Sequence, residues 1–254
     1  MYLFSNFEIL IAWRYLRSKR AEGGISTMTW ISLIGISLSV FALIATLSVR
    51  SGFRAELVDT ILGANAHVTI YKQPTKDSKG NVYRSFSDYE NLNSSISSLN
   101  SVKRAAPLIR GQVMASANAT TTGVDVFGIS PENILSIRRV ADPKTSIGDI
   151  KNFSEGLAIG SGVAQALNVS VGDEIKLISP TGVKTAFGSG PRIKTFEVQY
   201  VFTAGRHDMD KVRVYMPFRN AQEYFDKDSL ADEIEVLVKQ PDQIEKIVEE
   251  LSII

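Results

Sequence analysis

The 254-residue sequence contains no cysteine and only two histidines. The chain therefore has no disulfide framework and no thiolate metal cluster. A cysteine-free protein suits both a reducing and an oxidising compartment, so this absence does not indicate a location. The formal net charge is +1, which argues against the basic patch that a nucleic-acid partner requires.

Common nucleotide-binding and catalytic motifs are also missing. There is no phosphate-binding loop of the form GxxxxGK followed by Ser or Thr, and no HExxH motif. The string around Ser161 lacks the spacing of a nucleophile elbow, and a serine before a short helix is usually its cap. His207 and Asp208 could pair with Ser161 or Ser189, but a histidine in a loop between strands is usually a surface residue. We therefore predict no catalytic residue, no cofactor and no metal site.

Residues 29–49, TWISLIGISLSVFALIATLSV, form an apolar run of 21 residues that ends at Arg50. About 20 apolar helical residues span the hydrocarbon core of a bilayer, so the run predicts a transmembrane helix. A cleaved signal peptide would have a shorter apolar region, roughly 7–15 residues, and a small-residue cleavage site close by. The run therefore predicts an uncleaved anchor.

Small residues recur along one face of this run at steps of three and four. In lipid, small residues let helix backbones approach closely, so the face predicts packing against other membrane helices. The alternative is that small residues are simply common in membrane helices. The stripe consists of Ser32, Gly35, Ser39, Ala42 and Thr46.

The flanks of the run predict its orientation and its neighbours. Four basic residues lie shortly before it (Arg14, Arg17, Lys19 and Arg20), and two follow it (Arg50 and Arg54). This excess places the N-terminus in the cytoplasm and the bulk of the chain in the periplasm of a bacterium. Residues 3–20 are amphipathic and predict a helix in the plane of the membrane interface. Helical spacing continues beyond the run to about Leu62, where Gly63 is placed to end the helix.

The remaining residues predict an α+β fold. A strand is expected at 67–71, then a polar turn or hairpin at 73–86, and a helix to about 99 opened by a capping box of Ser87 and Glu90. Strands 102–117 and 120–129 and a short helix at 131–137 follow. The next stretch is mostly β, with a short helix at 162–167 and strands at 174–179, 193–203 and 212–216. A helix after Pro217, a strand at 233–238 and a helix at 242–251 complete the pattern.

These patterns divide the chain into five parts. An interfacial amphipathic helix (1–28) precedes the transmembrane helix and its extension (29–62). An αβ lobe is expected in two parts, 63–150 and 217–254, because each part alone has too little core. A mostly-β lobe (151–216) would be inserted between them.

The connection between the strands at 174–179 and 193–203 is a candidate partner-binding hairpin. Proline at both ends stiffens it, and Phe187 is an apolar tip residue with no evident core to enter. Exposed aromatic side chains on rigid β supports are common binding devices. The alternative is a long hairpin whose Phe187 folds back. The candidate residues are Pro180, Thr181, Gly182, Phe187, Gly188 and Pro191.

Several short motifs, taken together in their order along the chain, resemble those of the LolC/LolE family of lipoprotein-releasing ABC permeases, within the wider MacB/FtsX-like group. They are SGFRAEL (51–57), ILG (61–63), VFGI (126–129), GLAIG (156–160), VGD (171–173) and VYMP (214–217).

The resemblance implies a MacB-like periplasmic domain after the first span. The hairpin at 180–191 would be the hook-like hairpin that captures the periplasmic chaperone LolA. Lipoprotein acyl chains and neighbouring membrane helices would meet Phe41, Ile44, Leu47, Phe53, Leu57 and Ile61. ATP hydrolysis would belong to a separate LolD-like subunit, and a second LolC/LolE-like subunit, identical or paralogous, would complete the complex.

The sequence differs from the family in the number of membrane spans. Family members have four spans and this sequence has one, so we expect the others in a longer product or on another chain, and no transport by this stretch alone. The predicted function is the N-terminal part of a subunit that releases lipoproteins from the bacterial inner membrane. The alternatives are a MacB- or FtsX-like subunit for efflux or cell-wall hydrolase control, and a membrane-anchored periplasmic scaffold.

Overall fold

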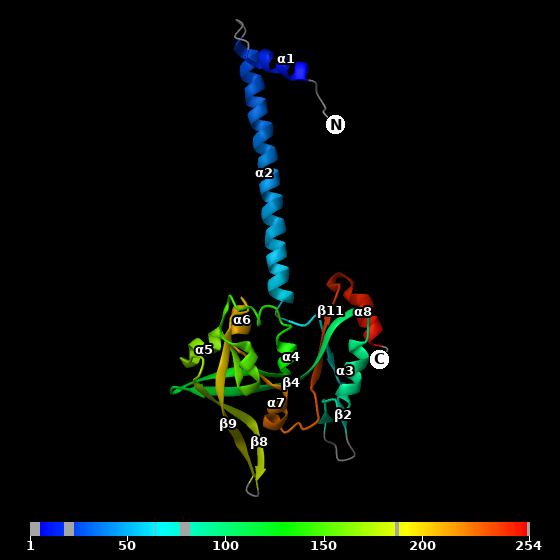
Figure 1. The fold of residues 1–254 in the computed structure, drawn as a ribbon, viewed down its shortest axis with the longest axis vertical. Coiled ribbons are helices and arrows are strands. Elements are labelled where there is room, and N and C mark those ends of the chain that lie inside the picture. The colour runs from blue at the N-terminus through cyan, green and yellow to red at the C-terminus, as the bar shows by residue number, and fades with distance from the viewer. Residues whose placement is uncertain (1–5, 18–22, 64, 77–81, 186–187, 253–254) are drawn as a thin grey trace. The chain divides into compact units, whose positions relative to one another are not determined.

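The computed structural model describes residues 6–17, 23–63, 65–76, 82–185 and 188–252. The chain divides into two compact units, Met1–Leu57 and Val58–Ile254 (Figure 1). The first unit is helical and the second is a mixed α and β domain, so the predicted α+β class with one apolar N-terminal helix is confirmed.

The first unit contains α1 (Asn6–Arg17) and most of α2 (Gly23–Leu62). At 1.5 Å per residue, the 40 residues of α2 measure about 60 Å, about twice the hydrocarbon core of a bilayer. Its stretch Thr27–Arg54 is long and apolar enough to cross a membrane, and the chain itself buries none of the most apolar part. The predicted continuation of the span as one helix to residue 62 is confirmed.

Hydroxyl groups within α2 bond back to the helix. The Ser39 hydroxyl donates to the Gly35 carbonyl at 2.8 Å, and the Thr46 hydroxyl donates to the Ala42 carbonyl at 2.7 Å. Because a hydroxyl without a partner is costly in hydrocarbon, these bonds make the small-residue face compatible with lipid or with a neighbouring helix.

In the second unit, the described residues form a nine-stranded sheet and a separate pair of short strands, β2 (Thr75–Lys76) and β3 (Val82–Tyr83). The order in the large sheet is β1-β11-β4-β5-β10-β7-β9-β6, and β8 pairs with both β4 and β9. The bounds are β1 (Val68–Tyr71), β4 (Val102–Ala117), β5 (Thr120–Ile129), β6 (Ser146–Gly148), β7 (Leu157–Gly160), β8 (Glu174–Thr185), β9 (Gly188–Phe202), β10 (Arg213–Pro217) and β11 (Glu233–Val238).

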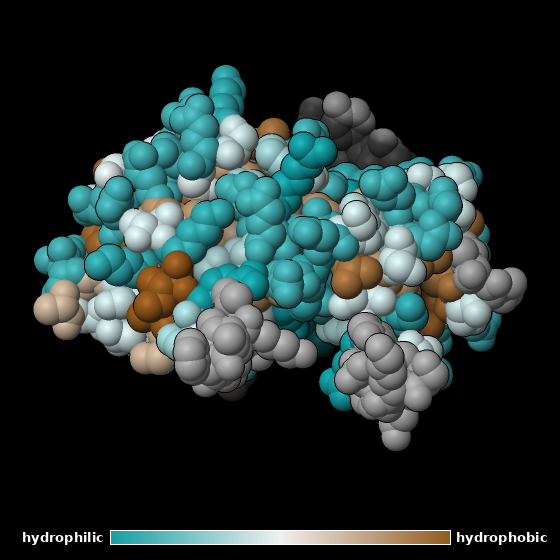
Figure 2. All heavy atoms as spheres, turned by 90° about the horizontal axis from the view of Figure 1, so that it is seen from below, coloured by the Kyte–Doolittle hydropathy of each residue, from teal (hydrophilic) through white to brown (hydrophobic). Residues whose placement is uncertain are grey.

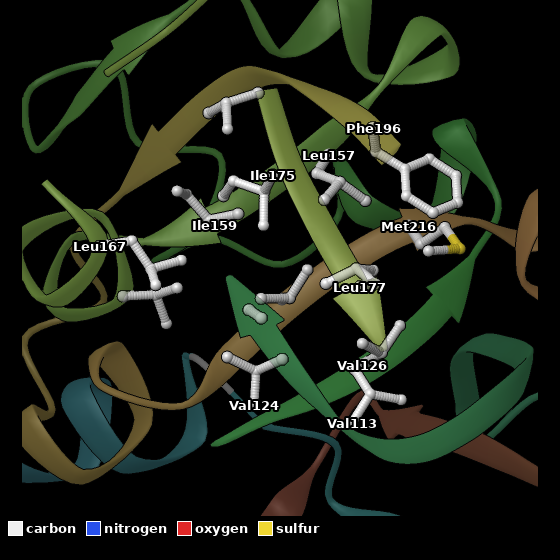
Figure 3. Close-up of a cluster of buried hydrophobic side chains, with 14 of the residues drawn as sticks. Val113, Val124, Val126, Leu157, Ile159, Leu167, Ile175, Leu177, Phe196 and Met216 are labelled. Atoms are coloured by element: carbon white, nitrogen blue, oxygen red, sulfur yellow. The ribbon is translucent and has the colours of Figure 1, made fainter. Parts of the chain in front are cut away.

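The double pairing of β8 closes part of this sheet into a ring. The ring runs β4-β5-β10-β7-β9-β8 and returns to β4, where Met114, Ala115 and Ser116 lie opposite Ile178, Leu177 and Lys176. Alternate side chains of a closed sheet point inward. The inward row fills the ring with buried residues, among them Val113, Val124, Ile159, Ile175 and Leu177 (Figure 3).

Strand β4 is 16 residues long and takes part in two regions of the sheet. Its second half is part of the ring, and its first half pairs with β11, which pairs in turn with β1. On one face of these three strands lie α3 (Tyr89–Ser97) and α8 (Ile244–Leu251), preceded by the short helix η2 (Pro241–Gln243). Their core contains Ile96, Val102, Val236 and Ile247.

Short helices surround the ring. A second buried cluster, with Phe127, Ile134, Phe153, Phe202 and Tyr215, joins α4 (Pro131–Ile134) and η1 (Ile150–Glu155) to the outer side of β5, β9 and β10. The helices α5 (Ser161–Leu167), α6 (His207–Asp210) and α7 (Phe218–Phe225) complete the domain. Strands from 63–150 and 151–216 thus share one ring, while the boundaries of the predicted inserted lobe stay a prediction.

Two local predictions are corrected by the structure. The cap of α3 is Asp88 rather than Ser87, and it makes no side-chain bond to the helix backbone; its carboxylate instead accepts from the Asn91 side chain at 2.6 Å. The strands expected at 174–179 and 193–203 extend to Thr185 and back to Gly188, because their backbones continue to pair beyond both prolines. The strands expected at 102–117 and 120–129 are confirmed, and Asn118 and Ala119 between them both have positive φ.

Candidate functional site: the β8–β9 hairpin

The connection predicted to bind a partner is the outer part of the antiparallel β8–β9 hairpin. The strands pair regularly from Glu174↔Glu197 to Ser179↔Arg192, and pair again from Val183↔Gly190 to Thr185↔Gly188. Between these stretches the register shifts, so residues 180–182 lie opposite Pro191 alone. Proline has no N–H to donate to a ladder, which accounts for the irregularity at Pro180 and Pro191.

The backbones of the two hairpin strands approach closely at Gly182 and Gly190. A Cβ atom added to Gly182 would lie 1.2 Å from the Gly190 carbonyl oxygen, whereas a Cβ added to Gly190 would meet nothing within 4 Å. Since two non-bonded heavy atoms cannot approach this closely, the backbone path at position 182 requires glycine. The structure gives this one member of the predicted set, Gly182, a clear backbone role.

The base of the hairpin is attached to the C-terminal end of α7. Arg192, which is partly buried, donates through one guanidinium nitrogen to the Glu223 carbonyl at 2.8 Å and to the Tyr224 carbonyl at 2.7 Å. These carbonyls lie at the negative end of the helix dipole, where a cation is favoured. The hairpin is therefore seated on α7 by a charge-assisted contact that the sequence did not predict.

Aromatic side chains reinforce this attachment. The ring of Tyr224 packs edge-on against Phe196 of β9 at 5.9 Å and against Phe225 at 4.9 Å between centroids. Burial raises the pKa of Tyr224 to about 12, so its hydroxyl stays protonated. On the exposed side, Lys194 lies 3.7 Å from the Glu223 carboxylate and 5.3 Å from the centre of the Phe196 ring.

The other predicted binding residues have different positions. Phe187 lies outside the described residues, the side chain of Thr181 is not described, and Gly188 pairs through its backbone with Thr185. Pro180 and Pro191 are exposed on the two strands. The structure therefore brings the two prolines and Gly182 together at the register shift, and the role of Phe187 stays a prediction.

The predicted membrane contacts all lie on α2. Phe41, Ile44, Leu47, Phe53 and Leu57 are exposed, while the Ile61 side chain is not among those described. The stripe of Ser32, Gly35, Ser39, Ala42 and Thr46 is exposed too. Within the described chain no partner covers either set, so their contacts stay a prediction.

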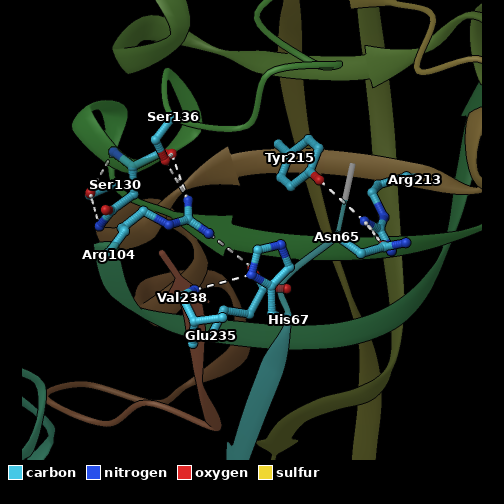
Figure 4. Close-up of polar contacts among 10 residues, drawn as sticks. Asn65, His67, Arg104, Ser130, Ser136, Arg213, Tyr215, Glu235 and Val238 are labelled. Atoms are coloured by element: carbon cyan, nitrogen blue, oxygen red, sulfur yellow. Dashed lines mark hydrogen bonds and ion pairs between the residues drawn. The ribbon is translucent and has the colours of Figure 1, made fainter. Parts of the chain in front are cut away.

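A second polar arrangement holds the segment that follows α2 (Figure 4). The Gly63 carbonyl accepts from the Arg139 backbone at 3.2 Å, and the Asn65 side chain accepts from Arg213 at 3.3 Å. His67 donates its backbone N–H to Val236 and accepts from the Val238 N–H at its Nδ1 atom, both at 3.1 Å. The linker is thereby fixed to the sheet at Asn65 and His67, and to the turn after α4 at Gly63.

Behind this linker lies a buried ion pair. Arg104 donates to the Asn133 carbonyl at 2.8 Å and to the Ser136 hydroxyl at 2.7 Å, and its other terminal nitrogen lies 3.4 Å from Glu235. The two side chains are only 9% and 15% exposed. Burial raises the pKa of Glu235, and the Arg104 charge opposes that rise. We call Asn65, His67, Arg104, Arg213 and Glu235 the linker cluster.

The linker cluster was missed from the sequence because Arg104 and Glu235 are 131 positions apart. Strand pairing brings them together, since β4 and β11 are neighbours in the sheet. The only available signal was a charged residue inside each apolar strand, which is also typical of an exposed strand face.

Of the residues considered for catalysis, Asp208 is exposed and bound by its neighbour. Its carboxylate accepts from the Arg206 guanidinium at 2.6 and 3.3 Å, and this hydrogen bond lowers the pKa of Asp208. Ser161 is the first residue of α5, His207 is the first of α6, and the Ser189 side chain is not described. Within the described residues no three metal-ligating side chains gather.

Comparison with known proteins gives a family match. Residues 29–254 match the family described as MacB-like periplasmic core domain. The chain is 30% identical over 208 residues to "Lipoprotein-releasing system transmembrane protein LolC" of Neisseria meningitidis serogroup B, covering 81% of this chain and 48% of that protein. It is 28% identical over 181 residues to the LolE protein of Haemophilus influenzae, covering 68% and 41%.

The chain thus spans about half the length of the curated relatives it matches. Among solved structures, the periplasmic region of MacB from Actinobacillus actinomycetemcomitans covers 77% of this chain, with a TM-score of 0.47 and 10% identity.

Proposed function

Because the chain belongs to the MacB-like periplasmic core domain family and to its LolC/LolE-type permeases, we propose that it is the membrane-anchoring part of a lipoprotein-releasing permease subunit. Its relatives are named as transmembrane proteins of lipoprotein-releasing systems. The apolar helix α2 and the mixed domain that follows it fit this role.

The hairpin is the proposed contact for a LolA-like periplasmic chaperone. The observation that carries this proposal is its construction: a paired β support with Pro180 and Pro191 at its register shift, seated on α7 by Arg192. A rigid support lowers the entropy cost of presenting a binding residue. Pro180, Thr181, Gly182, Phe187, Gly188 and Pro191 form the proposed contact, with Phe187 as its apolar anchor.

The membrane helix has two proposed roles. Its bulky apolar residues Phe41, Ile44, Leu47, Phe53, Leu57 and Ile61 would meet lipoprotein acyl chains, and its small-residue stripe would pack against further membrane helices. The basic residues before the span favour a cytoplasmic N-terminus, a periplasmic domain and a location in the bacterial inner membrane.

Energy would come from another subunit. We infer that a LolD-like ATPase hydrolyses ATP, that this chain is not itself an enzyme, and that a second LolC/LolE-like subunit completes the complex. The relatives' names favour this function over efflux or cell-wall hydrolase control. A lone scaffold would need no packing face on α2.

A photo-crosslinking residue in place of Phe187, in the natural gene product, tests the proposal. Its expected product is an adduct with a LolA-like lipoprotein carrier, weakened when Pro180 and Pro191 are changed to alanine. The same residue at Leu135, which is exposed outside the hairpin, is the matched control. If no carrier adduct forms at normal expression, the assignment moves to the MacB/FtsX-like alternative. A second measurement is co-purification of an ATPase with this protein from membrane extracts, and its absence would favour the membrane-anchored scaffold.

A further inference from the structure

An open groove of about 810 Å³ lies where the end of β1 meets β11, β4 and the segment at 84–85. None of its lining residues belongs to the 180–191 hairpin, so the groove is distinct from the proposed chaperone contact. Its charged lining residues are Lys72, Arg84, Arg110, Lys227, Asp232 and Glu233. Figure 2 shows the face from which the β2–β3 and β8–β9 strands project, and its middle is largely hydrophilic.

The acidic residues of the groove are already engaged. One oxygen of Asp232 accepts from the Ser85 hydroxyl at 2.7 Å, and the other accepts from the Arg110 backbone at 2.9 Å and from Lys227 at 2.6 Å. Glu233 is buried and hydrogen-bonded to the Tyr71 side chain, and burial raises its pKa. Neither carboxylate is available to neutralise a further cation.

Two cations of the groove have no such partner. Arg84 is exposed and Lys72 is partly exposed, and among the described residues neither forms an ion pair. Arg110 is shared between Asp125, at 3.7 Å, and the Phe127 ring, at 5.0 Å, with its side chain 44% exposed. The groove therefore presents uncompensated positive charge in a concave setting, which attracts carboxylates or other anions.

Apolar surface and an open strand edge favour a peptide over a small anion. Tyr71 is 61% exposed and Pro74 is exposed beside it, and a bare phosphate would leave both uncovered. Strand β1 lies at the end of the sheet and, in the described part of the chain, pairs only with β11. Its free edge offers backbone donors and acceptors to an added strand.

From these observations we propose that the groove binds an extended acidic segment of a partner protein. The segment lies along the end of β1 and covers Tyr71 and Pro74, and its carboxylates pair with Lys72 and Arg84. The proposal goes beyond lipoprotein release and involves none of the hairpin residues.

Fluorescence anisotropy tests this binding with the chain in nanodiscs of zwitterionic phosphatidylcholine. The probe is a fluorescein-labelled decapeptide of alternating glutamate and valine. We expect saturable binding that weakens with salt, and a loss of roughly three- to tenfold in Lys72→Gln/Arg84→Gln because each exposed pair contributes modestly. The matched control, Lys144→Gln/Lys151→Gln, removes two exposed cations outside the groove and should keep wild-type affinity.

Charge reversal supplies an independent arm. The variant Lys72→Glu/Arg84→Glu should bind a lysine–valine decapeptide that the wild-type chain does not bind, which a merely unfolded variant could not do. Equal binding of the glutamate–valine probe by wild type and Lys72→Gln/Arg84→Gln would overturn the proposal. The proposal would also be overturned if a glutamine–valine peptide bound the wild-type chain as tightly as the glutamate–valine probe does. Complete displacement of the probe by inorganic phosphate at the probe's own concentration would overturn it too, and would assign the groove to a small anion.

Discussion

Two arginines hold two different parts of the domain, and they do so with different partners. In the linker cluster, the Arg104 side chain is 9% exposed and pairs with the Glu235 carboxylate. At the hairpin base, Arg192 is partly buried and binds two neutral carbonyls of α7. A buried charge that loses its partner is costly, whereas a carbonyl near the surface can turn to water. We infer that breaking the Arg104 contact destabilises the domain more than breaking the Arg192 contact does.

The largest expected effect comes from breaking the buried pair. The substitution Arg104→Met leaves Glu235 without its partner, and such losses cost about 3–5 kcal/mol. We expect the melting temperature of the domain, followed by circular dichroism, to fall by roughly 10 °C. As a control, Lys194→Ala removes an exposed pair and should cost less than about 1 kcal/mol.

A double variant sharpens this result. Adding Glu235→Leu to Arg104→Met removes the unpaired charge and should recover part of the lost stability. If the double variant is less stable than the single one, burial of the unpaired carboxylate is not the cause of the loss.

Next in size is the effect of a methyl group at the narrow point of the hairpin. Gly182→Ala would bring Cβ to 1.2 Å from the Gly190 carbonyl, so the strands must separate. We expect binding of a LolA-like chaperone to weaken by about tenfold or more, about 1.4 kcal/mol, with the melting temperature nearly unchanged. Gly190→Ala has open space and should bind normally; equal loss in both variants would contradict the geometry.

A smaller effect is expected at the hairpin base. Arg192→Ala removes two hydrogen bonds, each contributing about 0.5–1.5 kcal/mol, so the hairpin should open more often. Hydrogen exchange of β8 and β9 amides should accelerate by about tenfold. Arg219→Ala, an exposed arginine of α7, is the control; unchanged exchange in Arg192→Ala would show that α7 does not seat the hairpin.

The smallest expected effect is a pH dependence at the linker. Burial lowers the pKa of His67 from its ordinary 6.5, and the nearby positive charges of Lys103 and Arg104 lower it further. The folded state then binds fewer protons than the unfolded state, so this stabilisation is present above pH 6.5 and is lost as the pH falls through the folded pKa. His67→Gln should lose stability less steeply than wild type below that pH, as chemical denaturation can measure. Parallel curves would contradict the assignment.

The sequence predicted the parts of the molecule that depend on local patterns. Apolar length gave α2, the strands that form β4 and β5 were predicted within their observed bounds, and the resemblance to the LolC/LolE family is confirmed. The cap at Ser87 was wrong, since the capping pattern is one position out of register with the helix that forms. Local patterns fail where two overlapping choices differ by a single residue.

Non-local contacts could not be predicted. Closure of the ring depends on β8 pairing with β4, some 60 residues earlier, and no period in either strand specifies that partner. The seating of Arg192 on α7 and the pairing of Arg104 with Glu235 arise in the same way, from elements that meet only after folding. The hairpin was recognised by its prolines, but not the contacts that support it.

The most direct test of the central claim is an equilibrium titration of the nanodisc-embedded chain with a purified LolA-like chaperone from the same organism. We predict saturable one-to-one binding that Phe187→Asp weakens roughly tenfold or more, because a buried aromatic side chain contributes about 1.5–3 kcal/mol. Ile147→Asp, which changes an exposed apolar residue on β6, should bind like wild type. No saturable binding, or wild-type affinity in Phe187→Asp, would contradict the assignment of the hairpin as the chaperone contact.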